Sequence, residues 1–278
     1  FNIFLKKTQH YNWTFEEKAI LLNPDYYLAY YNLGNILLTQ KKLNEAIDCF
    51  TKAIHIKSDF SECFISISNA HMLKGNEDLA VLFINKALKV DPTNTAAYLN
   101  LGNILKGQRM VKEAIKSYEK AIGLDPENIE AYVNISLSQL LCGNYDLGWK
   151  NYELRDKTKK PILPHAIPKT KKLNQLPLSK EEKFLVITEQ GLGDTIHYMR
   201  YIKILREKGY KVSFCAQRVL HELIIDSGID LHPLNKEEGN SFKDGKWISL
   251  LSIPRLLGVK PEMPLISTPY ILPNIQVV

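Results

Sequence analysis

The sequence predicts two structural parts: an α-solenoid of repeated helix hairpins over residues 1–156, and a smaller α/β lobe over residues 183–278. Two observations carry this prediction. In the first part, small, large and proline residues recur together at a constant interval. In the second part that interval is lost, and short apolar runs alternate with helical patterns, which is typical of α/β folds. A Lys- and Pro-rich connection is predicted at residues 157–182.

The repeat is clearest over residues 95–128. Small residues allow two antiparallel helices to approach closely, large aromatic residues fill the gaps between neighbouring hairpins, and a proline ends the unit because it cannot continue a helix interior. The same chemistry recurs about 34 residues before and after, which is the spacing of the tetratricopeptide repeat. In this unit the small residues are Gly102, Ala114 and Ala121, the large ones Tyr98 and Tyr118, and the proline is Pro126.

Helix pairs are therefore expected in four consecutive units, each amphipathic with a period of 3.6 residues. No hairpin buries its apolar face alone, so the stack is the folding unit. Residues 1 to about 26 are expected to form a partial unit. The predicted helices are 27–40 and 43–56, 61–74 and 77–90, 95–107 and 111–124, and 129–142 and 145–156.

Asparagines recur on the first helices, which line the concave side of a stacked solenoid. They occupy one repeat position and the position three residues further along, on the same helix face. An Asn side chain offers two donors and an acceptor, so a ladder of them is suited to the backbone of an extended polypeptide. The alternative is that they cap or bridge helices. The predicted partner-binding residues are Asn32, Asn35, Asn69, Asn100, Asn103 and Asn134.

A single cation, Lys106, is expected on this face, which disfavours a co-chaperone that binds acidic tails through several Lys and Arg residues. The formal net charge of +6 is concentrated in the Lys- and Pro-rich connection, which we interpret as solvated. We therefore expect no nucleic-acid partner. Because no run approaches the roughly 20 apolar residues of a membrane span, no span is expected either.

The four cysteines lack the spacing of a zinc site, so buried free thiols in a reducing, cytoplasmic compartment and no metal are expected. The sequence begins without Met, so it is expected to start inside a longer product. The cysteines are Cys49, Cys63, Cys142 and Cys215.

In residues 183–278, strand patterns alternate with helical patterns, which predicts a doubly wound parallel sheet. An apolar run at 184–187 has the pattern of a buried parallel strand and precedes a helical pattern that continues to about 206. Further strands are expected at 211–216, 230–234 and 247–250, with helices at 220–228 and 254–257.

A glycine-containing loop, Glu189–Thr195, joins the first of these strands to its helix. Ligands of open α/β sheets bind at the carboxyl ends of strands, and glycines let the backbone approach a ligand closely. The loop does not fit a dinucleotide fingerprint, because Ile196 stands where a third glycine is required, and it lacks the Gly-Lys-Ser/Thr of a P-loop. Asp194 has two candidate roles: an N-cap, or a general base on an acceptor hydroxyl, with His197 on the same helix face.

Several motifs resemble bacterial tetratricopeptide-repeat glycosyltransferase-like proteins related to the heptosyltransferases, whose plan is similar to that of protein O-linked N-acetylglucosamine transferases. The resemblance implies that residues 183–278 form a Rossmann-like lobe, the acceptor-side half of a two-lobed GT-B fold. These motifs are Gly148-Trp149, Tyr152-Glu153-x-Arg155, Glu189-Gln190-Gly191-Leu192-Gly193-Asp194-Thr195-Ile196, Arg200-Tyr201, Leu250-Leu251-Ser252-Ile253-Pro254 and Pro269-Tyr270.

The resemblance further implies that Asp194 is a catalytic base in hexosyl or heptosyl transfer. His197 stands where Gln is expected, which leaves its role open. The implied substrate-binding residues are Glu189, Gln190, Gly191, Gly193 and Thr195. The donor, a nucleotide sugar, would rest on a second lobe that this sequence lacks, so no cofactor is expected on the chain itself.

Two functions follow from these features: a protein-binding scaffold fused to a glycosyltransferase-like acceptor lobe that is incomplete for catalysis, or a non-catalytic interaction scaffold with a vestigial lobe. The sequence leaves the sugar, the acceptor, the partner and the oligomeric state open.

Overall fold

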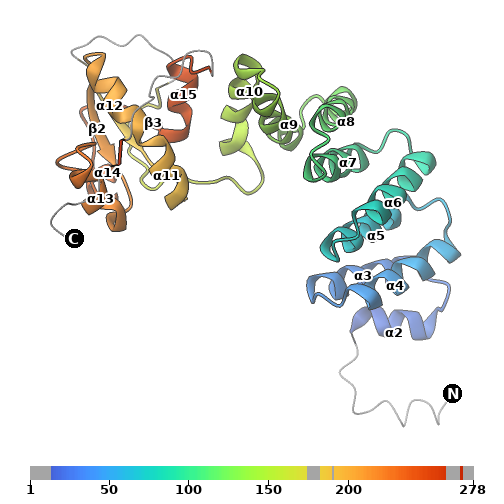
Figure 1. The fold of residues 1–278 in the computed structure, drawn as a ribbon. Coiled ribbons are helices and arrows are strands. Elements are labelled where there is room, and N and C mark those ends of the chain that lie inside the picture. Colours follow the sequence, from blue (N-terminus) through green and yellow to red (C-terminus); the bar gives the residue numbers. More distant parts are fainter. Residues whose placement is uncertain (1–13, 174–181, 190, 261–269, 272–278) are drawn as a thin grey trace, which may run out of the picture. The chain divides into compact units, whose positions relative to one another are not determined.

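The computed structural model describes residues 14–173, 182–189, 191–260 and 270–271, and the chain divides into two compact units, residues 1–138 and 139–278. In the first unit, helices follow one another as antiparallel pairs (Figure 1). From residue 27 onward, the bounds of the helices of this unit match the prediction or fall one residue short of it. They are α2 (Phe15–Leu22), α3 (Tyr27–Thr39), α4 (Leu43–Ile56), α5 (Ser61–Leu73), α6 (Glu77–Val90), α7 (Thr95–Gly107), α8 (Val111–Leu124) and α9 (Ile129–Leu141), the last of which crosses into the second unit.

The small residues act as predicted, as points of close approach within each pair. A Cβ atom on Gly34 would lie 2.5 Å from Cε1 of Phe50, and one on Gly102 would lie 2.5 Å from Cε1 of Tyr118. Both rings are fully buried. Only a glycine lets the two helices of each of these pairs come this close.

Neighbouring pairs share apolar clusters, so no hairpin buries its core alone. One cluster joins α4 and α5 through Phe50 and Ile67, and the next joins α5, α6 and α7 through Ile65, Ile84 and Ile104. The first helices also adjoin one another, α3 beside α5 and α5 beside α7. These first helices therefore form one continuous face of the unit.

In the second unit, the helix predicted at 145–156 ends early and divides into α10 (Tyr145–Tyr152) and a short 3₁₀-helix, η1 (Glu153–Lys157). The described residues then form a small parallel sheet of three strands in the order β2-β1-β3. Lys183 of β1 is in register with Lys211 of β2 and Gly245 of β3. The strands are β1 (Lys183–Ile187), β2 (Lys211–Cys215) and β3 (Gly245–Ser249).

Short helices connect the strands and pack on an apolar core formed by Phe184, Ile202, Phe214 and Ile248. The helical pattern predicted after the first strand is divided at Met199. The helices are α11 (Leu192–Tyr198), α12 (Arg200–Glu207), η2 (Arg218–Leu220), α13 (His221–Asp226), α14 (Lys236–Asn240), η3 (Leu250–Ser252) and α15 (Ile253–Leu256).

The strand predicted at 230–234 is wrong. Only a single bridge forms there, between Leu234 and Cys215. The segment turns instead, because Asp230 accepts a hydrogen bond from the backbone N–H of His232 (3.0 Å) and forms an ion pair with Arg206 (2.6 Å). Pro233 has no N–H to donate to a neighbouring strand. The described sheet is consequently smaller than the expected Rossmann-like lobe.

Part of the segment predicted as a solvated connection lies against the edge of β3. The N–H of Leu173 donates to the carbonyl of Trp247 (2.6 Å), and the N–H of Trp247 donates to the carbonyl of Lys171 (3.0 Å). Ala166 and Leu173 are buried.

No helix among the described residues is long and apolar enough to cross a membrane.

Candidate functional site

The first candidate site is the face that the first helices of the pairs present. Asn32 and Asn103 are exposed there, and the other four predicted asparagines are partly exposed. The capping alternative belongs to other residues: Asn94 accepts from the N–H of Ala97 (3.0 Å), and Asn128 accepts from the N–H of Ala131 (3.1 Å). The predicted asparagines therefore do not serve as helix N-caps.

Of the six predicted partner-binding asparagines, Asn103 makes a side-chain hydrogen bond to another described residue. Its Oδ1 accepts from the hydroxyl of Tyr118 at 2.8 Å, so at this position the alternative of a bridge between helices, here α7 and α8, is confirmed. Within the described part of the chain, the other five amides have no hydrogen-bond partner. Burial lowers the pKa of Lys106, the cation expected on this face. The structure thus presents polar amides that a ligand can reach.

The second candidate site is the carboxyl edge of the parallel sheet. Glu189, which follows β1, is buried and holds Arg155 through contacts of 2.6 Å and 3.3 Å to Oε1. Gln217, which follows β2, donates to the backbone carbonyl of Glu189 and accepts from the hydroxyl of Thr195 (3.1 Å). This edge of the sheet is therefore tied together by the protein's own side chains.

The remaining residues of the glycine-containing loop lie at the start of α11. Gly191 is the N-cap residue, so Asp194 falls inside the first turn and the interpretation as an N-cap is wrong. Asp194 is exposed, and its carboxylate folds back to within 2.6 Å of where a Cβ of Gly191 would lie. Around Gly193 a Cβ would meet no described atom within 4 Å. Gln190 lies outside the described residues.

His197 is exposed on α11, and its neighbour is a cation. The Nη2 atom of Arg200 lies 3.4 Å from Nδ1 of His197, and Nε of Arg200 donates to the carbonyl of His197 (2.7 Å). The imidazole is partly desolvated although the residue is exposed overall, and this desolvation, followed by the charge of Arg200, lowers the pKa of His197 while Asp194 opposes the shift. The imidazole of His197 is thus kept neutral near physiological pH. The catalytic roles of Asp194 and His197 stay predictions.

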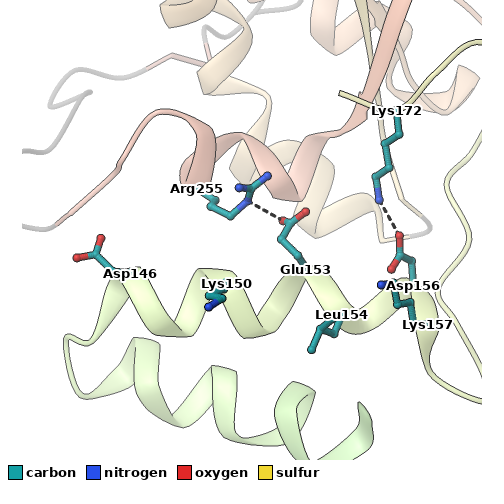
Figure 2. Close-up of a pocket in the computed structure, with 8 residues that line it drawn as sticks. All are labelled: Asp146, Lys150, Glu153, Leu154, Asp156, Lys157, Lys172 and Arg255. Atoms are coloured by element: carbon teal, nitrogen blue, oxygen red, sulfur yellow. Dashed lines mark hydrogen bonds and ion pairs between the residues drawn. The ribbon is translucent and has the colours of Figure 1, made fainter. Parts of the chain in front are cut away.

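A groove of about 590 Å³ in the second unit is lined largely by charged residues (Figure 2). Its acids hold its cations: Asp156 binds Lys172 at 2.7 Å, and Glu153 lies 3.6 Å from Arg255. These pairs connect η1 to the segment around Lys172, which lies beside β3, and to α15. No cluster of metal-ligating residues occurs among the described residues.

The sequence was also compared with known proteins. Tetratricopeptide-repeat family models match residues 27–60, 61–94 and 95–128. Residues 27–128 are tetratricopeptide repeats. These matches fall on α3 to α8, and the fourth predicted unit lies beyond them. The comparison with curated proteins gave no match.

Solved structures similar to this chain include tetratricopeptide-repeat domains. A crystal structure of MamA is 22% identical (TM-score 0.45) and covers 50% of this chain and 81% of its own. The first repeat domain of Spaghetti (RPAP3), bound to an HSP90 peptide, is 26% identical (TM-score 0.40; 42% and 92% covered). The Arabidopsis OM64 repeat domain is 23% identical (TM-score 0.40; 41% and 95%). These comparisons give no support to the glycosyltransferase resemblance.

Sequence reasoning missed two supporting residues of the candidate sites. Arg155 was noted only as part of a motif, although its charge is opposite to that of Glu189, which it binds. The repeat pattern predicts only that Tyr118 fills a gap between hairpins, whereas in the structure its hydroxyl also binds Asn103. The sequence does contain a signal for Tyr118. The residues one and two repeats earlier, Ile84 and Phe50, have no hydroxyl, so the hydroxyl of Tyr118 is a departure from the repeat pattern that indicates a polar contact.

Proposed function

We propose that this protein is a non-catalytic interaction scaffold whose tetratricopeptide repeats bind an extended polypeptide on the face of their first helices. The observation that carries the proposal is the set of amides on that face that neither cap helices nor bind described side chains. An unpaired amide on a surface is open to hydrogen bonding, and the alternating N–H and C=O groups of a polypeptide backbone are its natural partners.

The charge of the face supports a neutral backbone as the ligand. The asparagines that line it are uncharged, and Lys106 is the single cation expected among them. Ser66, which stands in the place of Asn100 one repeat earlier, is buried. A face of this composition makes few demands on ligand charge, so affinity depends on main-chain hydrogen bonds and apolar side-chain contacts. We therefore expect the bound segment to be extended and low in charge.

Binding of the protein to a library of random peptides tests this function. Asn100→Ala combined with Asn134→Ala is expected to weaken a selected peptide about tenfold, since each hydrogen bond contributes about 0.5–1.5 kcal/mol. The control is Asn85→Ala, which removes an exposed amide from the second helix α6. Equal affinities for the double variant, the control and the unmodified protein would argue against the asparagine face.

A second candidate is the acceptor-side lobe of a glycosyltransferase-like enzyme, favoured by one observation. Asp194 is exposed in the helix turn that follows β1, the central strand of a parallel sheet. Such edges commonly hold ligands. The buried pairing of Glu189 with Arg155 disfavours this candidate, because it removes a predicted substrate-binding carboxylate from contact with solvent.

Ligand-observed NMR separates the two candidates, with nucleotide sugars and free sugars added to the protein and to its Asp194→Ala variant. Sugar binding that disappears in the variant would support the acceptor lobe. An absence of binding in both proteins, together with peptide binding, would support the scaffold.

A further inference from the structure

One hydrogen bond distinguishes the repeat at 95–128 from its two predecessors. Tyr118 lies on α8, with its ring fully buried against Gly102, and its hydroxyl donates to Oδ1 of the exposed Asn103 on α7 at 2.8 Å. Burial raises the pKa of Tyr118, so the hydroxyl keeps its proton and acts as a donor. A buried residue of the second helix thus contacts a side chain of the partner-binding face.

This bond decides which half of the amide faces outward. The carboxamide of Asn carries a carbonyl acceptor on one side and an NH₂ donor on the other. With its carbonyl held by Tyr118, Asn103 has its NH₂ group left for a ligand. At the equivalent position, Phe50 and Ile84 have no hydroxyl, so Asn35 and Asn69 can turn either half of the amide toward a ligand.

We propose that Tyr118 is a positioning residue of the binding face: it fixes Asn103 as a hydrogen-bond donor, directed at a carbonyl or carboxylate oxygen of the bound polypeptide. This inference rests on the proposed function. Repeat 95–128 then binds a hydrogen-bond acceptor of the ligand. In repeats 27–60 and 61–94, Asn35 and Asn69 can bind either a donor or an acceptor. Fixing the amide before binding also removes the cost of ordering it in the complex.

The chain contains its own control for removing the hydroxyl. In repeat 27–60 the same place is occupied by Phe50, whose ring approaches Gly34 as closely as Tyr118 approaches Gly102, at 2.5 Å to a Cβ position in both. The site therefore accommodates Phe, and Tyr118→Phe removes only the donor. The reciprocal change, Phe50→Tyr, places a hydroxyl in the position from which it would reach Asn35.

The first measurement is NMR of the side-chain amide of Asn103 in the full chain. In the unmodified protein its two amide protons are expected to be well separated in shift, and in Tyr118→Phe they are expected to move toward the values of a freely rotating Asn. Unchanged resonances in the variant would overturn the inference. This measurement requires no ligand, so it decides the orientation of Asn103 even if the proposed function fails.

The second measurement is the affinity for a peptide selected from the random library. Tyr118→Phe is expected to weaken binding about three- to tenfold, and Asn103→Asp, which keeps an acceptor for Tyr118 but loses the NH₂ group, is expected to weaken it at least as much. If Asn100→Ala weakens binding while Tyr118→Phe does not, the inference is overturned and the proposed function stands. If no asparagine variant changes binding, the proposed function fails.

Discussion

The guanidinium of Arg155 is bound to the carboxylate of Glu189, with Nη2 2.6 Å from Oε1, and both side chains are buried. The same guanidinium donates to the hydroxyl of Ser252 (3.1 Å) and to the carbonyl of Tyr152 (3.1 Å), and it stacks over the Tyr152 ring. One arginine therefore connects η1, the end of β1 and η3. A buried ion pair whose remaining donors are satisfied in this way avoids the penalty of an uncompensated charge.

Arg155→Met is expected to lower the free energy of unfolding of the second unit by about 3–5 kcal/mol, because it leaves Glu189 buried without its cation. Adding Glu189→Gln should restore part of this loss, since a neutral amide is cheaper to bury than an unpaired carboxylate. Chemical denaturation followed by the fluorescence of Trp149 and Trp247 measures both variants. Strictly additive losses in the double variant would mean that the two side chains do not interact.

The repeats could be predicted from the sequence because their signal is local. Small residues such as Gly102 and Ala114 report close helix packing wherever they occur at this spacing, and hydrophobic periodicity locates each helix. The segment at 230–234 was predicted wrongly because its apolar residues resemble a strand, whereas the ion pair of Asp230 with Arg206 turns the chain. Contacts between residues distant in sequence, such as Arg155 and Glu189, have no local signal.

Gly102→Ala is expected to lower the stability of the first unit by about 1–3 kcal/mol, since its Cβ would overlap the buried ring of Tyr118. That ring has no freedom to withdraw, because its hydroxyl is bound to Asn103. Gly107→Ala, on the same helix, is the matched control. Its Cβ meets no described atom within 4 Å, so stability should stay equal or rise by up to about 1 kcal/mol.

Thermal unfolding by circular dichroism compares these two variants. Equal effects of Gly102→Ala and Gly107→Ala would show that helix propensity, rather than the packing of Tyr118, determines the requirement for glycine.

His71 is expected to make the first unit less stable in mild acid. It is buried, stacks on Phe83 with ring centroids 5.4 Å apart, and leaves Nδ1 without a hydrogen-bond partner in the described structure. Burial, followed by the charge of Lys74, lowers its pKa below the usual value of about 6.5. The unfolded chain therefore takes up the proton first, and stability falls as the pH drops through about 6.5 toward the lowered pKa of the folded state.

His71→Phe keeps the ring stack and removes this titration. Denaturation of both proteins between pH 5 and 8 should show a steeper loss of stability for the unmodified protein in the acidic half of that range. Parallel pH profiles would mean that His71 titrates alike in the folded and unfolded states.

The turn between the two helices of each repeat requires a left-handed residue, and the chain meets this requirement unevenly. Gly75 and Gly143 adopt φ values of +76° and +82°, whereas the corresponding positions one repeat away are Lys41 and Arg109, each with φ of +62°. A left-handed conformation costs a residue with a Cβ about 1–2 kcal/mol, a penalty that glycine does not incur.

Arg109→Gly is therefore expected to stabilise the first unit by up to about 1 kcal/mol, because relief of the strain exceeds the added entropy of glycine in the unfolded chain. Gly75→Ala should have the opposite effect and lower stability by about 1–2 kcal/mol. Chemical denaturation of the two variants beside the unmodified protein measures both. If Arg109→Gly destabilises the protein as much as Gly75→Ala does, the side chain of Arg109 makes contacts worth more than the backbone strain it imposes.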